Sequence, residues 1–226
     1  MTELFSKILV RLAVIVFGLS VPLVSAMAQE VAWETVSVRG EGKAPLCAPD
    51  TVYTSYVGNS GAFIFTNFTI QLPANSPHNS GAEFGACRIM TRFVIPSGYY
   101  LAGIAQSTQA GVVKSTGARG EIRTRLDIKP ANGGGGKIET RTRFAPADEM
   151  NQPLLALNGS YLATQSEITA ACKSQGAKAV NLEFRASIMG QRKDARSAII
   201  ISIDSSDTQI DLNYRLGVCP PQRGVR

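Results

Sequence analysis

The feature that most constrains the fold is a pair of segments, 121–128 and 137–144, in which charged side chains occupy every second position. The positions between them hold isoleucine, leucine, phenylalanine or threonine. A period of two is typical of a β-strand, whose successive side chains point to opposite faces of a sheet. Residues 129–136 contain Pro130 and a run of glycines, which end the first strand and allow a turn. The chain is therefore expected to form an antiparallel hairpin with one charged face.

The charges of this hairpin also predict its register. Opposite charges directly across an antiparallel pair contribute about 0.2–1 kcal/mol each, so the register that creates the most such pairs is favoured. The same register brings apolar side chains together on the other face. The predicted pairs are Asp127–Lys137, Arg125–Glu139, Glu121–Arg143 and Leu126–Ile138, with Arg123–Arg141 as the one like-charged pair.

Short runs of β-branched and aromatic residues, separated by turn residues, recur along the rest of the chain. This pattern predicts an all-β fold, an antiparallel β-sandwich of Greek-key or jelly-roll type. Residues 144–157 contain two prolines and are expected to form a surface loop, while residues 166–173 are the best candidate for a helix. Besides the hairpin, strands are predicted at 63–72, 87–95, 99–105, 180–189, 198–203 and 209–216.

The N-terminus has the pattern of an export signal. Two basic residues precede an apolar stretch at 12–23, which is short for a membrane span of about 20 residues. Residues 26–28 match the small-x-small cleavage pattern. We predict cleavage between Ala28 and Gln29, with the bond after Ala26 as the next choice; an uncleaved N-terminal anchor is the alternative. The mature protein is therefore expected to be secreted, in an extracellular or periplasmic compartment, with no further membrane span.

The four cysteines all follow this segment, and an even number in an exported chain indicates two disulfides. Of the three possible pairings we favour the sequential one, Cys47–Cys87 and Cys172–Cys219, which closes each end of the domain separately. A zinc site is disfavoured, because the chain has no C-x2-C spacing and a single histidine. The expected organisation is a signal peptide at 1–28, an N-terminal extension at 29–44, a β-sandwich at 45–219 and a basic tail at 220–226.

Several motifs, taken in order, resemble a known family. Residues 46–49 are similar to its first cysteine near a proline, 63–68 to its aromatic-rich strand, and 86–99 to its block of cysteine, strand, proline, glycine and aromatic residue. Residues 103–106 and 171–182 are similar to its following segments, and 204–219 to its closing block. Over about residues 45–219 the chain resembles the secreted family catalogued as domain of unknown function 4360. It departs from that family at 123–126, which is basic rather than aromatic, and at Ala171, where the family often has proline. The resemblance implies a secreted β-rich fold and no mechanism.

The hairpin carries the strongest signal for binding. It contains seven basic and three acidic residues between 119 and 143, and the mature chain has a net charge of +5. A basic face favours anionic surfaces, so the candidate partners are an acidic glycan or a cell-envelope surface such as lipopolysaccharide. The alternative is a solvated sheet face. Nucleic acid is not expected for an exported chain with few interleaved aromatics. The candidate polyanion-binding residues are Arg123, Arg125, Arg141 and Arg143.

Signals for catalysis and metal binding are weaker. The single histidine, His78, lies in a loop rich in proline, asparagine and serine, with no G-x-S-x-G motif. Asp204, Asp207 and Asp211 do not have EF-hand spacing and suit a turn. We therefore predict no metal, no cofactor and no catalytic residue, and a non-catalytic surface or glycan-binding module. A secreted hydrolase whose site assembles only in three dimensions is the alternative. Glycosylation sequons begin at Asn67 and Asn158.

Overall fold

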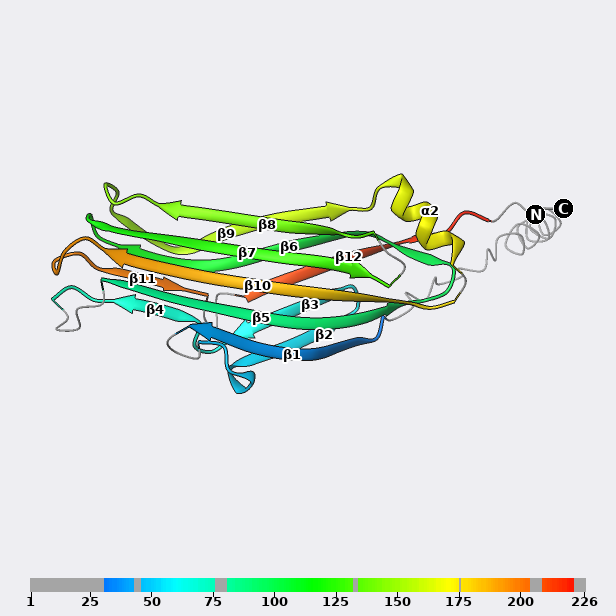
Figure 1. The fold of residues 1–226 in the computed structure, drawn as a ribbon, viewed down its shortest axis with the longest axis horizontal. Helices are drawn as coiled ribbons and strands as arrows, with labels where there is room; N and C mark the ends of the chain where they lie inside the picture. The colour runs from blue at the N-terminus through cyan, green and yellow to red at the C-terminus, as the bar shows by residue number, and fades with distance from the viewer. Residues whose placement is uncertain are drawn as a thin grey trace, which may run out of the picture.

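The computed structural model describes residues 31–42, 46–75, 81–131, 134–174, 176–203 and 209–221. Over these residues the chain forms two antiparallel sheets that pack face to face, with an α-helix at one end of the sandwich (Figure 1). The prediction of an all-β antiparallel sandwich with two disulfides is confirmed. The elements are β1 (Trp33–Gly42), η1 (Pro49–Thr51), β2 (Val52–Val57), β3 (Ser60–Phe65), β4 (Thr69–Leu72), β5 (Ala82–Ile95), β6 (Tyr99–Lys114), β7 (Ala118–Pro130), β8 (Gly136–Phe144), β9 (Met150–Leu162), α2 (Gln165–Lys173), β10 (Lys178–Arg192), β11 (Ile199–Ser202) and β12 (Gln209–Val218).

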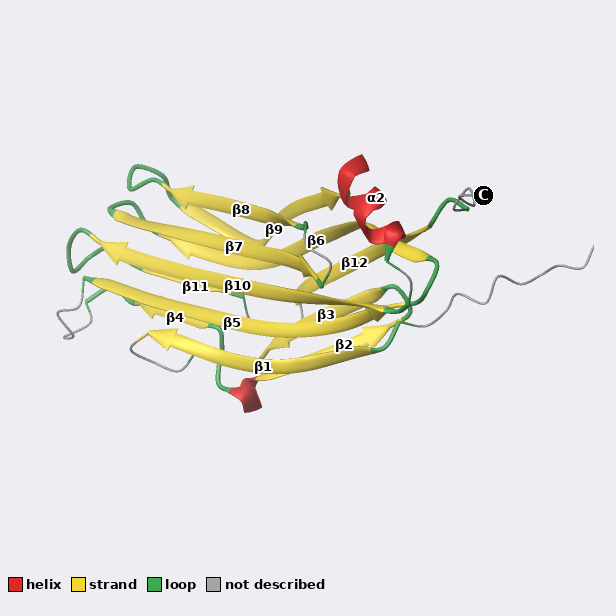
Figure 2. Cartoon of the chain, turned by 45° about the vertical axis from the view of Figure 1, so that its right-hand side comes forward, coloured by secondary structure: helices red, strands yellow, loops and turns green. Residues whose placement is uncertain are grey.

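The five-stranded sheet, sheet A, has the order β1-β5-β10-β7-β8. The second sheet, sheet B, is organised around the long strand β6, which has β9 on one side and β12 and β11 on the other. Strand β12 continues to β3 and β2, and β11 continues to β4. Several consecutive strands, such as β5 and β6, belong to different sheets, so neighbours within sheet A are mostly distant in sequence (Figure 2).

The core lies between the sheets and follows the period of two. In β10 the inward positions Val180, Leu182, Phe184, Ala186 and Ile188 are all buried, while the alternate positions lie on the outer face and, apart from Glu183, are half-buried or exposed. Phe184 packs against the ring of Phe63 from sheet B with centroids 5.8 Å apart. The apolar half of each alternating strand thus forms the core and leaves the charged half on the outer face.

The predicted strands are present, but several bounds differ: β5 begins at Ala82 rather than at residue 87, and β6 runs from Tyr99 to Lys114 rather than ending at residue 105. The segment 63–72 is divided by a turn into β3 and β4, which pair with different strands, β12 and β11. The expected loop at 144–157 is wrong, because β9 begins at Met150 and pairs with β6. Strand β9 is an edge strand, and Pro153 lies where its register shifts, so the proline removes no ladder hydrogen bond that the sheet requires.

Sequence patterns also missed two strands near the N-terminus. β1 lies within the segment 29–44, treated above as an extension, and pairs with β5 along its length. β2 pairs with β3. The β-sandwich therefore includes the chain from Trp33 onward. Most charged residues of β1 lie on the same face as those of the central strands, and this placement contributes to the site described below.

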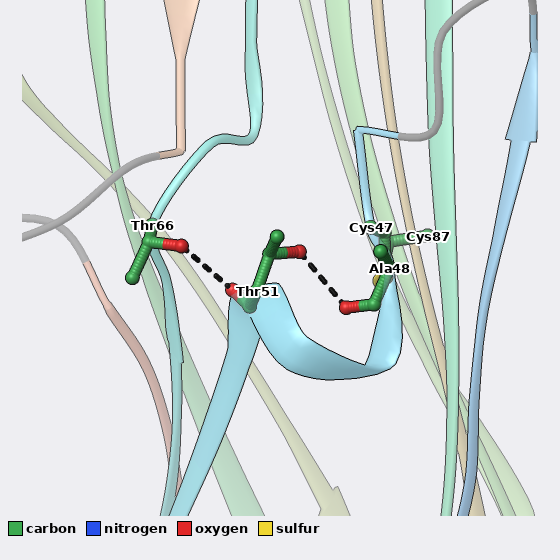
Figure 3. The surroundings of a disulfide bond; sticks show 5 residues. All are labelled: Cys47, Ala48, Thr51, Thr66 and Cys87. Atoms are coloured by element: carbon green, nitrogen blue, oxygen red, sulfur yellow. Dashed lines mark hydrogen bonds between the residues drawn. A yellow bond between two sulfur atoms is a disulfide. The ribbon is translucent and has the colours of Figure 1, made fainter.

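The two disulfides have the predicted sequential pairing. Cys47–Cys87 joins the segment after β1 to β5, beside the short helix η1, whose Thr51 hydroxyl donates a hydrogen bond to the carbonyl of Ala48 (Figure 3). Cys172–Cys219 joins α2 to the chain after β12. The predicted helix is confirmed as α2, which begins with a capping box between Thr164 and Glu167.

The predicted register of the hairpin is also confirmed. β7 and β8 pair with Asp127 opposite Lys137, Arg125 opposite Glu139 and Arg123 opposite Arg141. Charge alternation alone therefore identified which residues lie across from one another in this hairpin.

Candidate functional site: the outer face of sheet A

The outer face of sheet A, the side directed away from sheet B, is densely charged. Each of its strands contributes its solvent-facing half, and the register of the four pairings brings these residues into transverse rows. The basic residues of this face are Arg39, Arg88, Arg92, Arg119, Arg123, Arg125, Lys129, Lys137, Arg141, Arg143 and Arg185, and the acidic residues are Glu34, Glu41, Glu121, Asp127, Glu139 and Glu183.

This face accounts for the whole net charge of the chain after residue 28. The full sequence has 23 basic and 17 acidic residues, of which Lys7, Arg11 and Glu3 precede residue 29. When the eleven basic and six acidic residues of this face are also set aside, ten of each sign remain. The excess of positive over negative charge is therefore carried by this face, and the charges of the remaining residues cancel in sum.

A row of four arginines crosses this face. Arg39 lies opposite Arg88, Arg88 opposite Arg185, and Arg185 opposite Arg125, on the strands β1, β5, β10 and β7. The row ends on β8 with Glu139, which faces Arg125. Like charges directly across a strand pair are destabilising, so this arrangement opposes folding unless other groups compensate.

Glu183 provides part of that compensation. Its side chain is 5% exposed and lies 2.7 Å from the Nε of Arg88 and 3.0 Å from the Nζ of Lys129. The Nε of Arg185 donates a hydrogen bond of 2.6 Å to the same carboxylate. Burial alone raises the pKa of Glu183, but the contacts from Arg185, Lys129 and Arg88 outweigh it and lower the pKa to about 2. One buried carboxylate thus holds three cations in place.

In the hairpin, the ion pairs run diagonally, along one strand or directly across. The Arg123 guanidinium lies 2.8 Å from Glu139, whereas Arg125 pairs with Asp127 of its own strand at 2.7 Å. Arg141 and Arg143 both contact Glu121, at 2.6 and 3.1 Å. A hydrogen bond from Arg141 lowers the pKa of Glu121 below its ordinary value of 4.5.

Arg123 and Arg141 are the like-charged pair of the predicted register, yet each has an acidic partner. The predicted register is correct, but an arginine side chain is long enough to reach a carboxylate in the neighbouring row of the hairpin. The Cα atoms of such a diagonal pair are about 7–8 Å apart. Arg123 and Arg141 are consequently as well partnered as Arg143. Cations without an ion pair in the described structure lie elsewhere on the face, at Arg39 for example, which is exposed.

A hollow of about 260 Å³ lies in the middle of this face. Its floor is formed by Ala86 and Ser187, two small residues directly opposite each other on β5 and β10. Four arginines contribute to its lining: Arg88, Arg123, Arg125 and Arg185. The remaining outer-face residues in the lining are Glu41 and Phe84, and Phe84 is 48% exposed. Two small side chains among long ones create this depression.

The structure brings together part of the predicted site. Arg123 and Arg125 line the hollow, whereas Arg141 and Arg143 lie on the edge strand β8 and do not. The sequence reasoning missed Arg88 and Arg185, although their strands were predicted, because nothing local indicates that β5 and β10 lie beside β7.

The structure provides little information on the other candidate residues. His78, Asp204 and Asp207 lie outside the described residues, and Asp211 lies on β12, in sheet B. Among the residues that the structure describes, no group of three histidine, cysteine or acidic residues is placed to hold a metal ion. No described helix is long and apolar enough to cross a membrane. Asn67 and Asn158 are both exposed, in a turn and on β9.

No family model matches the chain, and the curated proteins include no match to its sequence. Several solved structures match the chain at low similarity. One is TmCBM61, solved in complex with β-1,4-galactotriose, whose sequence is 10% identical to this chain. The match covers 80% of this chain and 91% of TmCBM61, with a TM-score of 0.28. TmCBM27, a mannan-recognising carbohydrate-binding module, is 15% identical with coverages of 80% and 88% and a TM-score of 0.29. The CBM22-1 xylan-binding domain of Paenibacillus barcinonensis Xyn10C is 9% identical with coverages of 81% and 96% and a TM-score of 0.23.

The chain is thus a disulfide-linked β-sandwich protein with one strongly basic sheet face. Its likeness to these carbohydrate-binding modules is distant, with identities of 15% or less and TM-scores below 0.3.

Proposed function

We propose that this protein is a secreted, non-catalytic module that binds a polyanion, an acidic glycan, on the outer face of sheet A. The observation that carries the proposal is the row Arg39–Arg88–Arg185–Arg125, in which like charges lie side by side on four adjacent strands. Such a row disfavours the folded state; Glu183 and Asp127 offset part of this repulsion, and an extended anionic chain lying across the strands would supply further negative charge, including at Arg39.

The spacing of the row suits an extended ligand. Neighbouring strands lie about 4.8 Å apart, so four arginines span about 14 Å across the sheet. Guanidinium groups form bidentate hydrogen bonds with carboxylate, sulfate and phosphate oxygens, which favours arginine over lysine on a surface of this kind. The side chains of Arg88, Arg125 and Arg185 are 36–51% exposed, so their ion pairs leave part of each group open to a ligand.

Two further observations support a location outside the cytoplasm. Both disulfides are formed, and disulfides persist in oxidising compartments. The segment 1–28 has the export pattern described above. An acidic glycan is a ligand available to an exported protein.

The hydrolase alternative has less support. Glycoside hydrolysis requires two carboxyl groups about 5–9.5 Å apart at the bond to be cleaved. Among the described residues, Glu41 is the one carboxylate that lines the hollow. The site therefore favours binding over catalysis.

The test is retention on immobilised heparin, a densely anionic glycan, as a function of salt. Arg39→Gln with Arg185→Gln removes two charges from the row, and we expect elution at clearly lower salt because the attraction is electrostatic and screened beyond about 8 Å at physiological ionic strength. The matched control is Lys173→Gln with Arg215→Gln, which removes two exposed charges from α2 and β12. The proposal is wrong if the parent is not retained, or if both double variants shift elution equally.

A further inference from the structure

We propose that the hollow beside the arginine row is a subsite for a single sugar residue that carries a sulfate or phosphate ester. This inference rests on the proposed function and narrows it from a charged face to one binding position with defined chemistry.

The register arranges the residues around the hollow as a small grid. Ala86 and Ser187 form the floor. Arg88 follows Ala86 by two residues on β5, and it lies opposite Arg185 of β10, so these two arginines border the floor at one end. Phe84 precedes Ala86 by two residues and borders the floor at the other end. Across the strands, Glu41 is opposite Ala86 on one side, and Arg123 is opposite Ser187 on the other. The hollow therefore has a cationic end, an aromatic end, one acidic wall and one basic wall.

The cationic end suits a tetrahedral oxyanion. Arg88 and Arg185 line the hollow at one end, Arg123 lines it at the side, and Ser187 lies at its floor. These arginines also contact Glu183 or Glu139, but their side chains are 36–51% exposed, so part of each group is open to a ligand. A sulfate or phosphate ester presents three free oxygens and can accept hydrogen bonds from several guanidinium groups at once. A carboxylate presents two coplanar oxygens, which one bidentate arginine largely satisfies. Three arginines and a hydroxyl around one position therefore favour the ester over the carboxylate.

The opposite end suits the apolar face of a sugar ring. Phe84 is 48% exposed, and Met189, directly opposite it on β10, is 38% exposed. Together they form an apolar patch within an otherwise charged face, and an aromatic side chain offers a large rigid surface for C–H contacts. The carboxylate of Glu41 can accept hydrogen bonds from sugar hydroxyls, and its charge directs the anionic group toward the Arg123 side.

The size of the hollow agrees with one residue rather than a longer ligand. Its volume of about 260 Å³ lies below the range of about 300–1,000 Å³ typical of pockets for drug-sized molecules. Neighbouring residues of a glycan chain would lie outside the hollow, along the arginine row.

The experiment uses glucose 6-sulfate, glucose 6-phosphate, glucuronate and glucose, with binding followed through the backbone amide signals of Ala86 and Ser187. Glucose 6-sulfate and glucuronate both carry one negative charge, so a difference between them reports the shape of the anion rather than its charge. We expect glucose 6-sulfate to bind at least about fivefold more tightly than glucuronate, and glucose to cause no shift. At pH 5 the phosphate ester also carries about one charge, and comparison with the sulfate ester there identifies the preferred ester.

The variant Ala86→Leu fills the floor of the hollow without changing any charge. We expect it to weaken binding of the sulfate ester at least about tenfold while heparin retention stays close to that of the parent. Asn181→Leu is the matched control, because it adds the same side chain to an exposed position of β10, six residues from Ser187 and outside the hollow. It should bind the ester as the parent does.

The outcomes separate the two proposals. If glucose 6-sulfate and glucuronate bind alike, or if Ala86→Leu retains the preference, the subsite is wrong while heparin retention still supports the proposed function. If the parent shows no salt-sensitive retention on heparin, the proposed function is wrong and the subsite falls with it.

Discussion

Arg185 of β10 and Arg125 of β7 lie directly opposite each other on the outer face of sheet A, and on its other side Arg185 lies opposite Arg88 of β5. Neither arginine is left without a carboxylate, because Arg185 contacts Glu183 and Arg125 pairs with Asp127 at 2.7 Å. The carboxylates lie two residues along the strands from the arginines that they contact. The face therefore tolerates a row of like charges by placing acids in the neighbouring row, and the guanidinium groups remain partly exposed.

Removal of the buried acid should destabilise the protein. Glu183→Gln leaves Arg88, Arg185 and Lys129 without their shared carboxylate, and we expect a loss of about 2 kcal/mol in the free energy of unfolding. Urea unfolding measures the change. Glu34→Gln is the control, since Glu34 is exposed on β1 and has no ion pair in the described structure, and it should stay within about 0.5 kcal/mol of the parent. A loss below that level for Glu183→Gln would show that the carboxylate does not hold the row.

The same carboxylate predicts a dependence of stability on pH. The pKa of Glu183 is about 2 in the folded protein, against an ordinary value of 4.5. Because the pKa of Glu183 is lower in the folded than in the unfolded protein, its ionised carboxylate stabilises the fold. This stabilisation is complete at pH values above about 4.5 and is lost as the pH falls from about 4.5 to about 2. The free energy of unfolding should therefore fall over this interval, and less steeply in Glu183→Gln. Equal slopes for parent and variant would contradict the prediction.

Removal of one arginine should leave the fold intact or stabilise it. Arg39 is exposed, lies opposite Arg88 and has no ion pair in the described part of the chain. Relief of like-charge repulsion in Arg39→Gln should raise the free energy of unfolding by up to about 0.5 kcal/mol at low salt. Because salt screens this repulsion, the difference should shrink in 1 M salt. A clear loss of stability at low salt would indicate a structural role for Arg39 that the sheet geometry does not show.

The disulfide between α2 and the end of β12 should contribute substantially to stability. Cys172 and Cys219 are separated by 47 residues, and chain-entropy arguments give about 4 kcal/mol for a loop of this length. Replacing both by alanine should lower the melting temperature markedly without abolishing the β-sheet signal in circular dichroism, because the sandwich core does not include α2. An unchanged melting temperature would contradict the prediction, because it would mean that loss of the disulfide adds little conformational entropy to the unfolded chain.

Local patterns predicted the elements whose partners are close in sequence. The hairpin of β7 and β8 and its register followed from charge alternation, because a short turn leaves few alternative pairings. The helix α2 and the sequential disulfides were also predicted. Strand β9 was missed, because two prolines near its start resemble a loop, and an edge strand tolerates proline where a central strand does not.

The candidate site was predicted in part for the same reason. Arg123 and Arg125 belong to the hairpin and were identified, whereas Arg88 and Arg185 come from strands whose position beside β7 no local pattern reveals. The sequence also predicted Arg123 and Arg141 only as a like-charged pair, whereas the structure gives each of them a carboxylate partner. The period of a strand specifies which side chains share a face, but not how far an arginine reaches along it.

The sequence by itself therefore determined the class of fold, the hairpin register and the presence of charged strand faces, because these depend on periodicity and short-range pairing. The order β1-β5-β10-β7-β8 was decided by tertiary structure, since strands far apart in the chain become neighbours only when both sheets bury their apolar faces against each other. That order places Arg39, Arg88, Arg185 and Arg125 in one row and puts two small residues, Ala86 and Ser187, side by side beneath the hollow. The arginine row and the hollow exist because of this packing, and no single segment of the sequence contains them.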